Sequence, residues 1–372
     1  MTGRRIPFVN LQPGEDTAAV RAAIDRVLAR GWFVLGPEVG AFETEFAAIC
    51  GAPYAVGVGT GTDALALIFR ALGIGPGDEV ITSPLSAAFT ALAIMMAGAK
   101  PVFADIDAVR LTLNPAAATA AITPRTAAIL PVHLYGQAAE MAVFAQIGQR
   151  HGLAVVEDCC QSHLATCAGR PVGTFGTAGA FSFYPTKNLG ALGDAGAVIT
   201  REAALADRVR RIRNGGQTTR CQHVEAGVNS RLDELQAAIL RARLPFLRKW
   251  TARRRTLAAI YRARLVESPI LVPPELDAGH VYHLFPVRSL ERSALQAHLA
   301  AQGIDTLIHY PLPITQQPAV ASMEPADCPI ANQVCDEVLS LPVYPSLDDD
   351  DVSSVAGAVC SFPASRGAGV SR

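Results

Sequence analysis

The sequence predicts an α/β fold, with a large domain built on a mainly parallel seven-stranded sheet and a smaller C-terminal α+β domain. The first observation behind this prediction is a series of seven short apolar runs between residues 55 and 200, most of which contain β-branched residues or phenylalanine. The second is that Ala/Leu-rich helical stretches separate several of these runs. Strands that are apolar on both faces and joined by helices form parallel sheets covered on both sides.

The bulk composition fits a folded enzyme-sized chain. Its 372 residues favour one large and one smaller domain. Half of the residues are apolar and 17% are charged, which is enough for a large core and argues against disorder. The formal net charge of −1 provides no global attraction to nucleic acid or anionic membranes. A phosphate-bearing ligand must therefore be bound by local groups.

The predicted strands end in turn or polar residues. In chain order they are Ala55–Val58, Val80–Thr82, Pro101–Ala104, Ala127–Val132, Leu153–Glu157, Gly179–Phe183 and Gly196–Thr200. Three of the helical stretches between them are Asp63–Leu72, Thr90–Ala97 and Ala138–His151. Ligands of parallel sheets bind beyond the carboxyl ends of the strands, so the residues after each run are the candidates for function.

A second region begins near residue 231. Strong helix formers over Arg231–Arg243 end before Pro245, and a basic helix follows over Lys249–Leu265. We place the large domain at residues 1–245, with the N-terminal segment included, and the small domain at residues 246–372. The arginines of the basic helix indicate either a solvated helix face or an anion-binding edge, and the solvated face is the commoner case. They are Arg253, Arg254, Arg255, Arg262 and Arg264.

Cysteine usage and the chain ends predict a cytoplasmic protein. None of the eight cysteines forms a C-x-x-C pair, so we expect reduced thiols and no metal site. The first five residues have no apolar signal core behind them, and no run approaches the roughly 18 apolar residues of a membrane helix. The Ser/Gly/Ala-rich tail after Phe362 is expected to be frayed.

The first motif is the Gly59–Leu65 stretch, which follows a strand and opens a helix. Glycines let the backbone approach a ligand, and the free N–H groups of the helix start favour a phosphate. The hydroxyls of Thr60 and Thr62 can add hydrogen bonds. Gly57 and Gly59 also have the G-x-G spacing of a dinucleotide loop, but Thr62 occupies the position of its third glycine.

The second motif is Asp158, at the end of the buried run Leu153–Glu157. A carboxylate at that position needs a positive partner or strong donors. A protonated pyridine nitrogen is such a partner, and the pairing would make the ring an electron sink. When Asp158 is taken alone, a helix N-cap or a core salt bridge is the commoner explanation.

The third motif is Lys187, within the stretch Phe181–Gly190 in which Pro185 ends a strand. A lysine in a cleft is partly desolvated, which lowers its pKa and makes its amine nucleophilic toward an aldehyde. A single lysine after a strand is usually a surface residue. Lys187, Asp158 and the Gly59–Leu65 turn all lie at strand ends of one α/β unit, and this coincidence favours a catalytic site.

These motifs and others resemble the DegT/DnrJ/EryC1/StrS family of sugar aminotransferases, which are fold-type-I pyridoxal-phosphate enzymes. The resemblance runs from about Phe8 to Val352. The stretches that carry it are Gly36–Val39 with Phe42–Glu43, Gly61–Leu65, Pro101–Asp107, His133–Gly136, Glu157–Asp158, Ser182–Asn188, Asn229–Ala238, His309–Pro311 and Leu341–Pro345.

The resemblance implies a role for each candidate cofactor residue. Lys187 would form the Schiff base with pyridoxal 5'-phosphate and carry the proton, while Asp158 would pair with the pyridine nitrogen and Gln161 with the ring hydroxyl. The phosphate would be held by Thr60, Gly61, Thr62 and Ser182. Asn229 would reach that phosphate from the neighbouring subunit, so the active unit would be a homodimer with shared sites.

The resemblance also indicates the substrate side and shows three departures. The sugar would contact Tyr184, Arg231, His309 and Tyr310, and His163 would support the cofactor. The family's ring-stacking aromatic is replaced by Ala87, and Phe89 is the candidate to fill its place. A frequent histidine is Thr315 here, and Leu164–Cys167 replaces a usual Gly-Ala-aromatic pattern.

The implied activity is transfer of an amino group from L-glutamate to a nucleotide-linked keto-deoxysugar. The Leu189–Gly196 segment resembles members that act at C3, whereas members that act at C4 more often have a Gly-Glu-Gly-Gly type segment. The alternatives are a C4-keto sugar, a cyclitol, an aminohydroxybenzoate-type synthesis or a non-catalytic regulator. A dehydratase-type member would lack Lys187, and a regulator would not need Lys187, Asp158 and Gln161 together.

Overall fold

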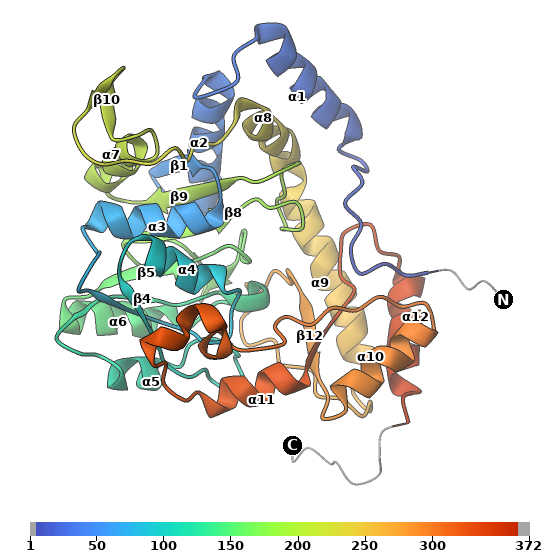
Figure 1. Cartoon of the computed structure of the whole chain (residues 1–372). Helices are drawn as coiled ribbons and strands as arrows, with labels where there is room; N and C mark the ends of the chain where they lie inside the picture. Colours follow the sequence, from blue (N-terminus) through green and yellow to red (C-terminus); the bar gives the residue numbers. More distant parts are fainter. Residues whose placement is uncertain (1–4, 364–372) are drawn as a thin grey trace.

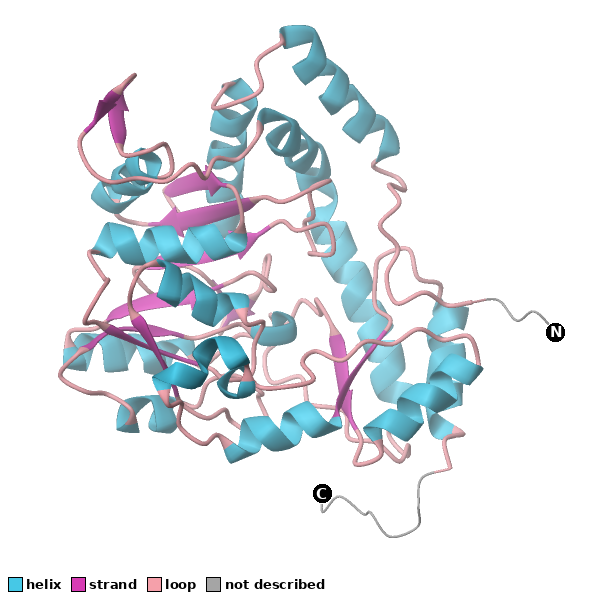
Figure 2. Cartoon of the chain, in the orientation of Figure 1, coloured by secondary structure: helices cyan, strands magenta, loops and turns pink. Residues whose placement is uncertain are grey.

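A computed structural model describes residues 5–363 of the chain, so the tail after residue 363 lies outside the described residues. Helices alternate with short strands over residues 54–158 (Figures 1 and 2). The described helices are α1 (Thr17–Arg30), α2 (Pro37–Cys50), α3 (Gly61–Leu72), α4 (Phe89–Met96), α5 (Pro115–Ala120), α6 (Met141–His151), α7 (Ala203–Ile212), α8 (Glu234–Arg243), α9 (Leu247–Arg264), α10 (Arg292–Ala301), α11 (Pro329–Glu337) and α12 (Asp349–Cys360).

One seven-stranded sheet forms the centre of the molecule, with the strand order β1-β9-β8-β5-β4-β2-β3. Its strands are β1 (Tyr54–Val58), β2 (Glu79–Thr82), β3 (Lys100–Phe103), β4 (Thr126–Leu130), β5 (Ala154–Asp158), β8 (Ala178–Ser182) and β9 (Gly196–Thr200). Each overlaps one of the seven predicted strands, so the predicted sheet is confirmed. The predicted run Ala127–Val132 extends past the end of β4 because Pro131 has no N–H group for the ladder.

The strand β9 is the antiparallel member of this sheet. It pairs antiparallel with β1 and with β8, whereas β2, β3, β4, β5 and β8 pair in parallel. Parallel neighbours need a crossover helix, but β8 returns directly to β9 through residues 183–195. This connection carries Lys187 and therefore lies at the carboxyl end of β8.

Both faces of the sheet are covered, because alternate residues of each strand pack on opposite sides. On one face, Val56, Val156 and Val198 pack with α3, α4 and α7. On the other face, Ala197 and Ile199 join α2 and α8 in one cluster, and strand residues from β2, β4 and β5 pack with α5 and α6 in another. Because successive residues of a strand point to opposite faces and both faces are covered, most positions are buried, and the strands are continuous apolar runs.

The C-terminal part has its own core of helices and a small antiparallel pair, β12 (Phe285–Arg288) and β13 (Val338–Leu341). That core also contains Ile6, whose backbone bonds to the Gly303 carbonyl. Helix α9 contributes Leu247 to the core of the large part and Leu257 to the C-terminal core. The division of the chain at residue 245 stays a prediction.

Short two-stranded sheets complete the fold: β6 (Thr166–Cys167) with β7 (Arg170–Pro171), and β10 (Gln217–Thr219) with β11 (Gln222–His223). All eight cysteines have free thiols. Within residues 5–363, no helix combines the length and the apolar content needed to span a bilayer.

Candidate active site

The carboxyl ends of β1, β5 and β8 meet at one edge of the sheet. Gly61, which follows β1, lies in close contact with residues that follow β5 and end β8. A side chain at Gly61 would place its Cβ 2.7 Å from the Ser182 Cβ and 2.8 Å from the Cys160 Sγ. Real Cβ atoms essentially never come this close to other atoms, so glycine is required where α3 starts against these two segments. The three predicted motifs are therefore brought together in one place.

The start of α3 has the features of an anion-binding turn. Thr60 caps the helix, and its Oγ1 accepts a hydrogen bond from the Asp63 N–H at 3.0 Å. The N–H groups of Gly61 and Thr62 open the helix and so have no intrahelical acceptor. Ser182 lies against Gly61 from β8. This arrangement fits the phosphate that the sequence predicts at Thr60–Thr62 and Ser182.

The loop before α8 supports this turn from behind. The Ser230 Oγ accepts a hydrogen bond from the Gly59 N–H at 3.0 Å and donates one to Asp63 at 2.8 Å. The adjacent Asn229 is exposed in the single chain. Arg231 donates a hydrogen bond to the Asn214 Oδ1 at 3.0 Å. Ser230 thus serves its own subunit's turn, while the side chain of Asn229 stays available at the surface.

Asp158 ends β5 as a buried carboxylate, 4% exposed. Its Oδ2 accepts a hydrogen bond from the Thr90 hydroxyl at 2.9 Å, and its Oδ1 accepts one from the Cys160 N–H at 3.1 Å. Both donors are neutral, and Asp158 forms no ion pair with a basic side chain within residues 5–363. A buried carboxylate of this kind lacks a cationic partner. The core-salt-bridge alternative for Asp158 is wrong, and a ligand's protonated ring nitrogen fits the site.

Gln161 links this edge of the sheet to the C-terminal part. Its Oε1 accepts a hydrogen bond from the Tyr135 N–H at 2.8 Å, and its Nε2 donates to the Tyr310 hydroxyl at 3.0 Å. The Tyr135 hydroxyl in turn donates to the backbone carbonyl of His309. The predicted ring residue Gln161 and the predicted sugar residues His309 and Tyr310 therefore belong to one hydrogen-bonded network.

Lys187 lies in the β8–β9 connection, where its N–H donates to the Tyr184 carbonyl at 2.8 Å. Its side chain keeps partial exposure to solvent, although packed protein surrounds the amine. Burial lowers the pKa of the Lys187 ammonium, and the negative charge of Asp158 offsets part of this lowering. Desolvation of this kind raises the fraction of the neutral, nucleophilic amine.

Three histidines surround Lys187. His163 is 1% exposed, and neither of its ring nitrogens forms one of the hydrogen bonds found within residues 5–363. The His283 Nδ1 lies 3.3 Å from the Asn188 Oδ1, and the His309 Nδ1 lies 3.0 Å from the Ser340 hydroxyl. Burial, followed by the charge of Lys187, lowers the pKa of all three.

These three histidines and His280, which lies outside the site, are therefore neutral in the folded protein, which predicts a loss of stability in mild acid. Burial lowers the pKa of His163 and of His280 to about 3, that of His309 to about 4 and that of His283 well below 6.5. Unfolding lets each ring bind a proton once the pH falls below about 6.5, so stability is complete above that pH and declines below it. From pH 7.5 to pH 5.5 we expect a loss of about 1.3 kcal/mol for each of the four, or about 5 kcal/mol in all.

Urea denaturation at the two pH values would measure this loss. The His280→Gln variant should reduce the pH-dependent loss by about one quarter, whatever its stability at pH 7.5. An unchanged loss in that variant would contradict a neutral His280 in the folded protein.

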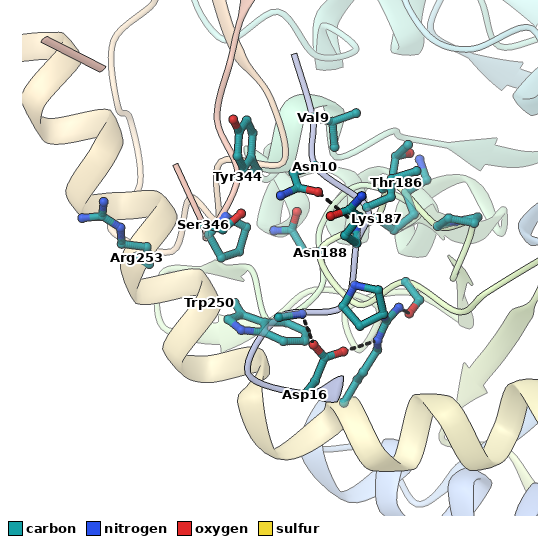
Figure 3. Close-up of a pocket in the computed structure, with 18 of the residues that line it drawn as sticks. Val9, Asn10, Asp16, Thr186, Lys187, Asn188, Trp250, Arg253, Tyr344 and Ser346 are labelled. Atoms are coloured by element: carbon teal, nitrogen blue, oxygen red, sulfur yellow. Dashed lines mark hydrogen bonds and ion pairs between the residues drawn. The ribbon is translucent and has the colours of Figure 1, made fainter. Parts of the chain in front are cut away.

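A cavity of about 480 Å³ opens beside Lys187 (Figure 3). One wall is the β8–β9 connection at residues 185–190, and the opposite wall consists of residues of α9, including Trp250 and Arg253. The N-terminal segment at residues 9–16 and the turn at residues 344–346 complete the lining. Its volume lies within the range of small-molecule sites.

Two predicted residues are exposed in the single chain. Phe89, at the start of α4, is 63% exposed, and Tyr184 is 52% exposed. The next residue, Thr90, is buried and joins Ser86, whose hydroxyl lies 2.9 Å from the Thr90 hydroxyl. Assignment of Phe89 as the ring-stacking residue stays a prediction, as does contact of Tyr184 with a substrate.

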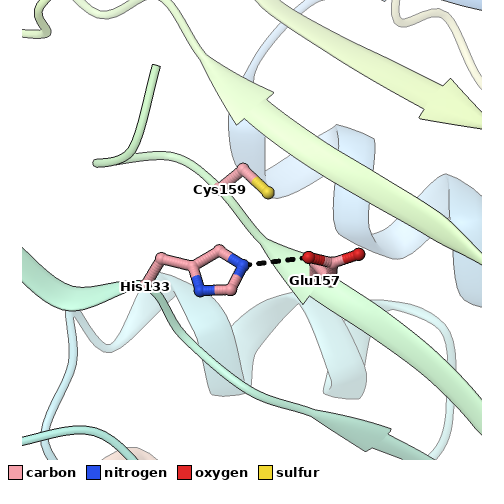
Figure 4. A group of neighbouring side chains, drawn as sticks. All are labelled: His133, Glu157 and Cys159. Carbon is pink, nitrogen blue, oxygen red and sulfur yellow. Dashed lines mark hydrogen bonds and ion pairs between the residues drawn. The ribbon is translucent and has the colours of Figure 1, made fainter. Parts of the chain in front are cut away.

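His133, Glu157 and Cys159 form a buried cluster that could suggest a metal site (Figure 4). The His133 Nδ1 accepts a hydrogen bond from the Ala139 N–H at 3.1 Å, so its Nε2 carries a proton and donates to Glu157 at 3.1 Å. Glu157 also accepts hydrogen bonds from the N–H groups of Gly173, Phe175 and Gly176. Both groups already have partners, so the cluster is structural.

Several site residues were not predicted from the sequence. Thr90 donates to Asp158 and is itself hydrogen-bonded to Ser86, Asn188 contacts His283, and Arg254 lines the cavity with Lys187. The basic-helix reading of Arg254 as part of a solvated face is wrong, because this residue is 4% exposed. No signal in the sequence distinguishes it from the other arginines of this helix.

Comparison with known proteins gives a consistent family signal. A sequence model of the DegT/DnrJ/EryC1/StrS aminotransferase family matches residues 15–360. The dTDP-3-amino-3,4,6-trideoxy-alpha-D-glucose transaminase of Streptomyces venezuelae is 46% identical over 361 residues, covering 95% of each chain. The UDP-2-acetamido-2-deoxy-3-oxo-D-glucuronate aminotransferase of Pseudomonas aeruginosa is 41% identical over 357 residues, covering 95% of this chain and 99% of that relative.

Two further similarities are to a relative that is named as a sensory transduction protein and to a solved crystal structure. The erythromycin biosynthesis sensory transduction protein EryC1 of Saccharopolyspora erythraea is 48% identical over 356 residues, covering 94% of this chain and 97% of that relative. The crystal structure of S. venezuelae DesV in complex with a ketimine intermediate superposes with a TM-score of 0.93 at 47% identity, covering 95% of this chain and 97% of that one.

Proposed function

The chain belongs to the DegT/DnrJ/EryC1/StrS aminotransferase family, and from this membership we propose that it transfers an amino group from L-glutamate to C3 of a nucleotide-linked keto-deoxysugar. The observation that carries the proposal is the convergence of Lys187, Asp158 and the Gly61 turn at one sheet edge, next to a cavity. The relatives from S. venezuelae and P. aeruginosa are both named for amination at C3 of a nucleotide sugar.

The residues at this edge fit pyridoxal 5'-phosphate, the cofactor of the family. The start of α3 with Ser182 would hold the phosphate, the carboxylate of Asp158 would pair with the ring nitrogen, and Gln161 would contact the ring hydroxyl. The amine of Lys187 would bind the aldehyde. When bound, the cofactor supplies an electron sink that makes the proton on the amino-bearing carbon acidic.

The protein's own groups would then manage charge and protons. The buried carboxylate of Asp158 would favour the protonated form of the ring nitrogen. The amine of Lys187 would take the proton from the amino-bearing carbon of glutamate and return a proton on the sugar side. The buried histidines His163 and His283 stay neutral, so they place no positive charge beside Lys187. The lowered pKa of the Lys187 ammonium therefore results from burial.

Two alternatives receive less support. Amination at C4 or of a cyclitol is disfavoured by the Leu189–Gly196 segment and by the C3-named relatives. A purely regulatory role is suggested by the printed name of EryC1. The lowered pKa of Lys187, and the buried carboxylate of Asp158 with no basic partner among the described residues, are features that a transaminase reaction would use, which supports the enzyme.

Assay of purified protein against a panel of nucleotide-linked keto sugars, with L-glutamate as donor, tests the proposal. The panel pairs 3-keto with 4-keto isomers on both dTDP and UDP. We expect 2-oxoglutarate and an amino sugar to form with the 3-keto members. Turnover confined to the 4-keto members would overturn the C3 assignment, and no turnover with any member would overturn the acceptor class.

We also propose a cytoplasmic homodimer with shared active sites. Asn229 is exposed in the single chain beside the turn that would bind phosphate. Large apolar side chains are also exposed, including Trp32, Phe33 and Leu192, as expected for a surface covered by a second subunit. Asn229 of one subunit would then complete the phosphate site of its neighbour.

Mixed dimers test the shared site. Lys187→Ala and Asn229→Ala subunits should each be inactive or weak alone, and Asn229→Ala should weaken cofactor binding about tenfold to hundredfold. In a hybrid dimer, one site carries both lesions and the other carries neither, so activity should reappear after subunit exchange. Dimers shown to have exchanged subunits, but with no recovered activity, would count against the shared site.

A further inference from the structure

A buried guanidinium without a counter-ion lines the cavity that contains Lys187. Arg254 of α9 is 4% exposed. Its Nη1 donates to the carbonyls of Tyr282, His283 and Val343, at 3.1, 3.2 and 2.8 Å. Its Nε has no hydrogen-bond partner, and its Nη2 forms none of the hydrogen bonds found within residues 5–363. Burial lowers the pKa of Arg254 to about 10, which still leaves it charged at neutral pH.

Apart from Lys187, the other basic residues of this cavity already have counter-ions. The pairs are Arg243 with Asp16 at 2.8 Å, Arg253 with Asp349 at 2.6 Å, and Lys249 with Glu15. Arg254 forms no such pair with a described carboxylate. A buried charge that lacks a partner is costly unless an anion compensates it, and the cavity beside Arg254 gives an anion access.

We propose that Arg254 binds the α-carboxylate of the amino-acid donor. This inference rests on the transaminase function proposed above, because a donor must bring its amino group to the position of Lys187. The α-carboxylate of an amino acid lies one carbon from that amino group, so its binding residue must line the same cavity. One unpaired guanidinium matches the single charge of a carboxylate better than the multiple charges of a sugar-linked diphosphate.

The competing explanation is that Arg254 acts only as a clamp. Its three bonds join α9 to residues 282–283, which precede β12, and to Val343, and a buried arginine can serve that purpose alone. The two roles differ in what they predict for ligand binding. A clamp affects stability and all ligands together, whereas a carboxylate site affects carboxylates specifically.

Arg254→Gln in the cofactor-loaded enzyme separates the two roles, with Arg253→Gln as the matched control at a position that has its own counter-ion. Equilibrium calorimetry with succinate, a dicarboxylate with no amino group to transfer, gives a readout independent of turnover. We expect Arg254→Gln to weaken succinate binding about tenfold to hundredfold and Arg253→Gln to change it by less than about twofold. If Arg254→Gln does not fold, Arg254→Lys keeps the charge and should show a smaller loss in the same direction.

A second measurement identifies the carboxylate. The wild-type enzyme should use L-glutamate at least about tenfold better than isoglutamine, its α-carboxamide, in the donor half-reaction. That preference should shrink in the Arg254 variants, while affinity for the nucleotide sugar stays within about twofold. Unchanged succinate binding, or a loss confined to the nucleotide sugar, would overturn the carboxylate site. If no amino acid reacts with the wild-type enzyme, the transaminase function itself is wrong.

Discussion

Lys187→Ala should abolish turnover and covalent attachment of the cofactor together. The chain contains three lysines, and the other two are Lys100, which is exposed, and Lys249, which pairs with Glu15. Lys187 is the one whose amine is held inside packed protein and whose pKa is lowered by burial. No other amine is placed to act as both nucleophile and base at the strand ends.

The measurement is direct because the chain has only two other lysines to which the cofactor could attach. Borohydride reduction followed by peptide mapping should find the cofactor on Lys187 in the wild-type protein and on no peptide of the variant. Lys249→Ala is the matched control, since Lys249 lines the same cavity, and its visible absorbance should remain. A reduced adduct on Lys100 or Lys249 of the wild-type protein would show that Lys187 is not the residue that binds the cofactor.

Asp158→Asn should lower the rate about a hundredfold or more while the fold survives. The amide removes the one charge that can hold the ring nitrogen protonated, and single electrostatic groups of this kind affect rates by roughly 10²–10³. Asn retains an acceptor and gains a donor, so it can keep bonds to Thr90 and Cys160. We expect the free energy of unfolding to change by about 1 kcal/mol or less.

Thr90→Val is the companion variant for Asp158. It removes the hydroxyl that bonds to Asp158 but leaves the carboxylate charge, so single-turnover rates should fall by about tenfold at most. Comparing Thr90→Val with Asp158→Asn therefore separates the effect of the Asp158 charge from the effect of its orientation. Near-normal single-turnover rates in Asp158→Asn would show that the carboxylate has another role, such as capping the Cys160 N–H.

The sheet could be predicted from the sequence because local patterns determine it. Each strand is a short apolar run that ends in a turn, and Gly196–Thr200 was found by the same rule as its parallel neighbours. That β9 runs antiparallel could not be read from its residues, because it depends on the missing crossover helix after β8. Lys187, Asp158 and Gly61 were found because strand ends of a parallel sheet share one edge.

The remaining site residues depend on contacts between distant segments. Thr90 and Asp158 are 68 positions apart, and nothing near Thr90 marks it as a partner of a carboxylate. Arg254 resembles its neighbours on a basic helix, and only the packing of Tyr282 and Val343 against α9 distinguishes it. His283 likewise becomes a neighbour of Asn188 only after the C-terminal part has packed against the sheet.

The N-terminal segment ties these two parts together across the cavity. At one end, the Ile6 N–H donates to the Gly303 carbonyl and the Asp305 N–H donates to the Ile6 carbonyl, at 2.9 and 3.0 Å. At the other end, Asp16 pairs with Arg243 of α8. Residues 9–16 between these anchors form a wall of the cavity. Trimming the chain to the start of α1 would thus remove a wall of the chamber beside Lys187 and leave the buried Arg243 without its counter-ion.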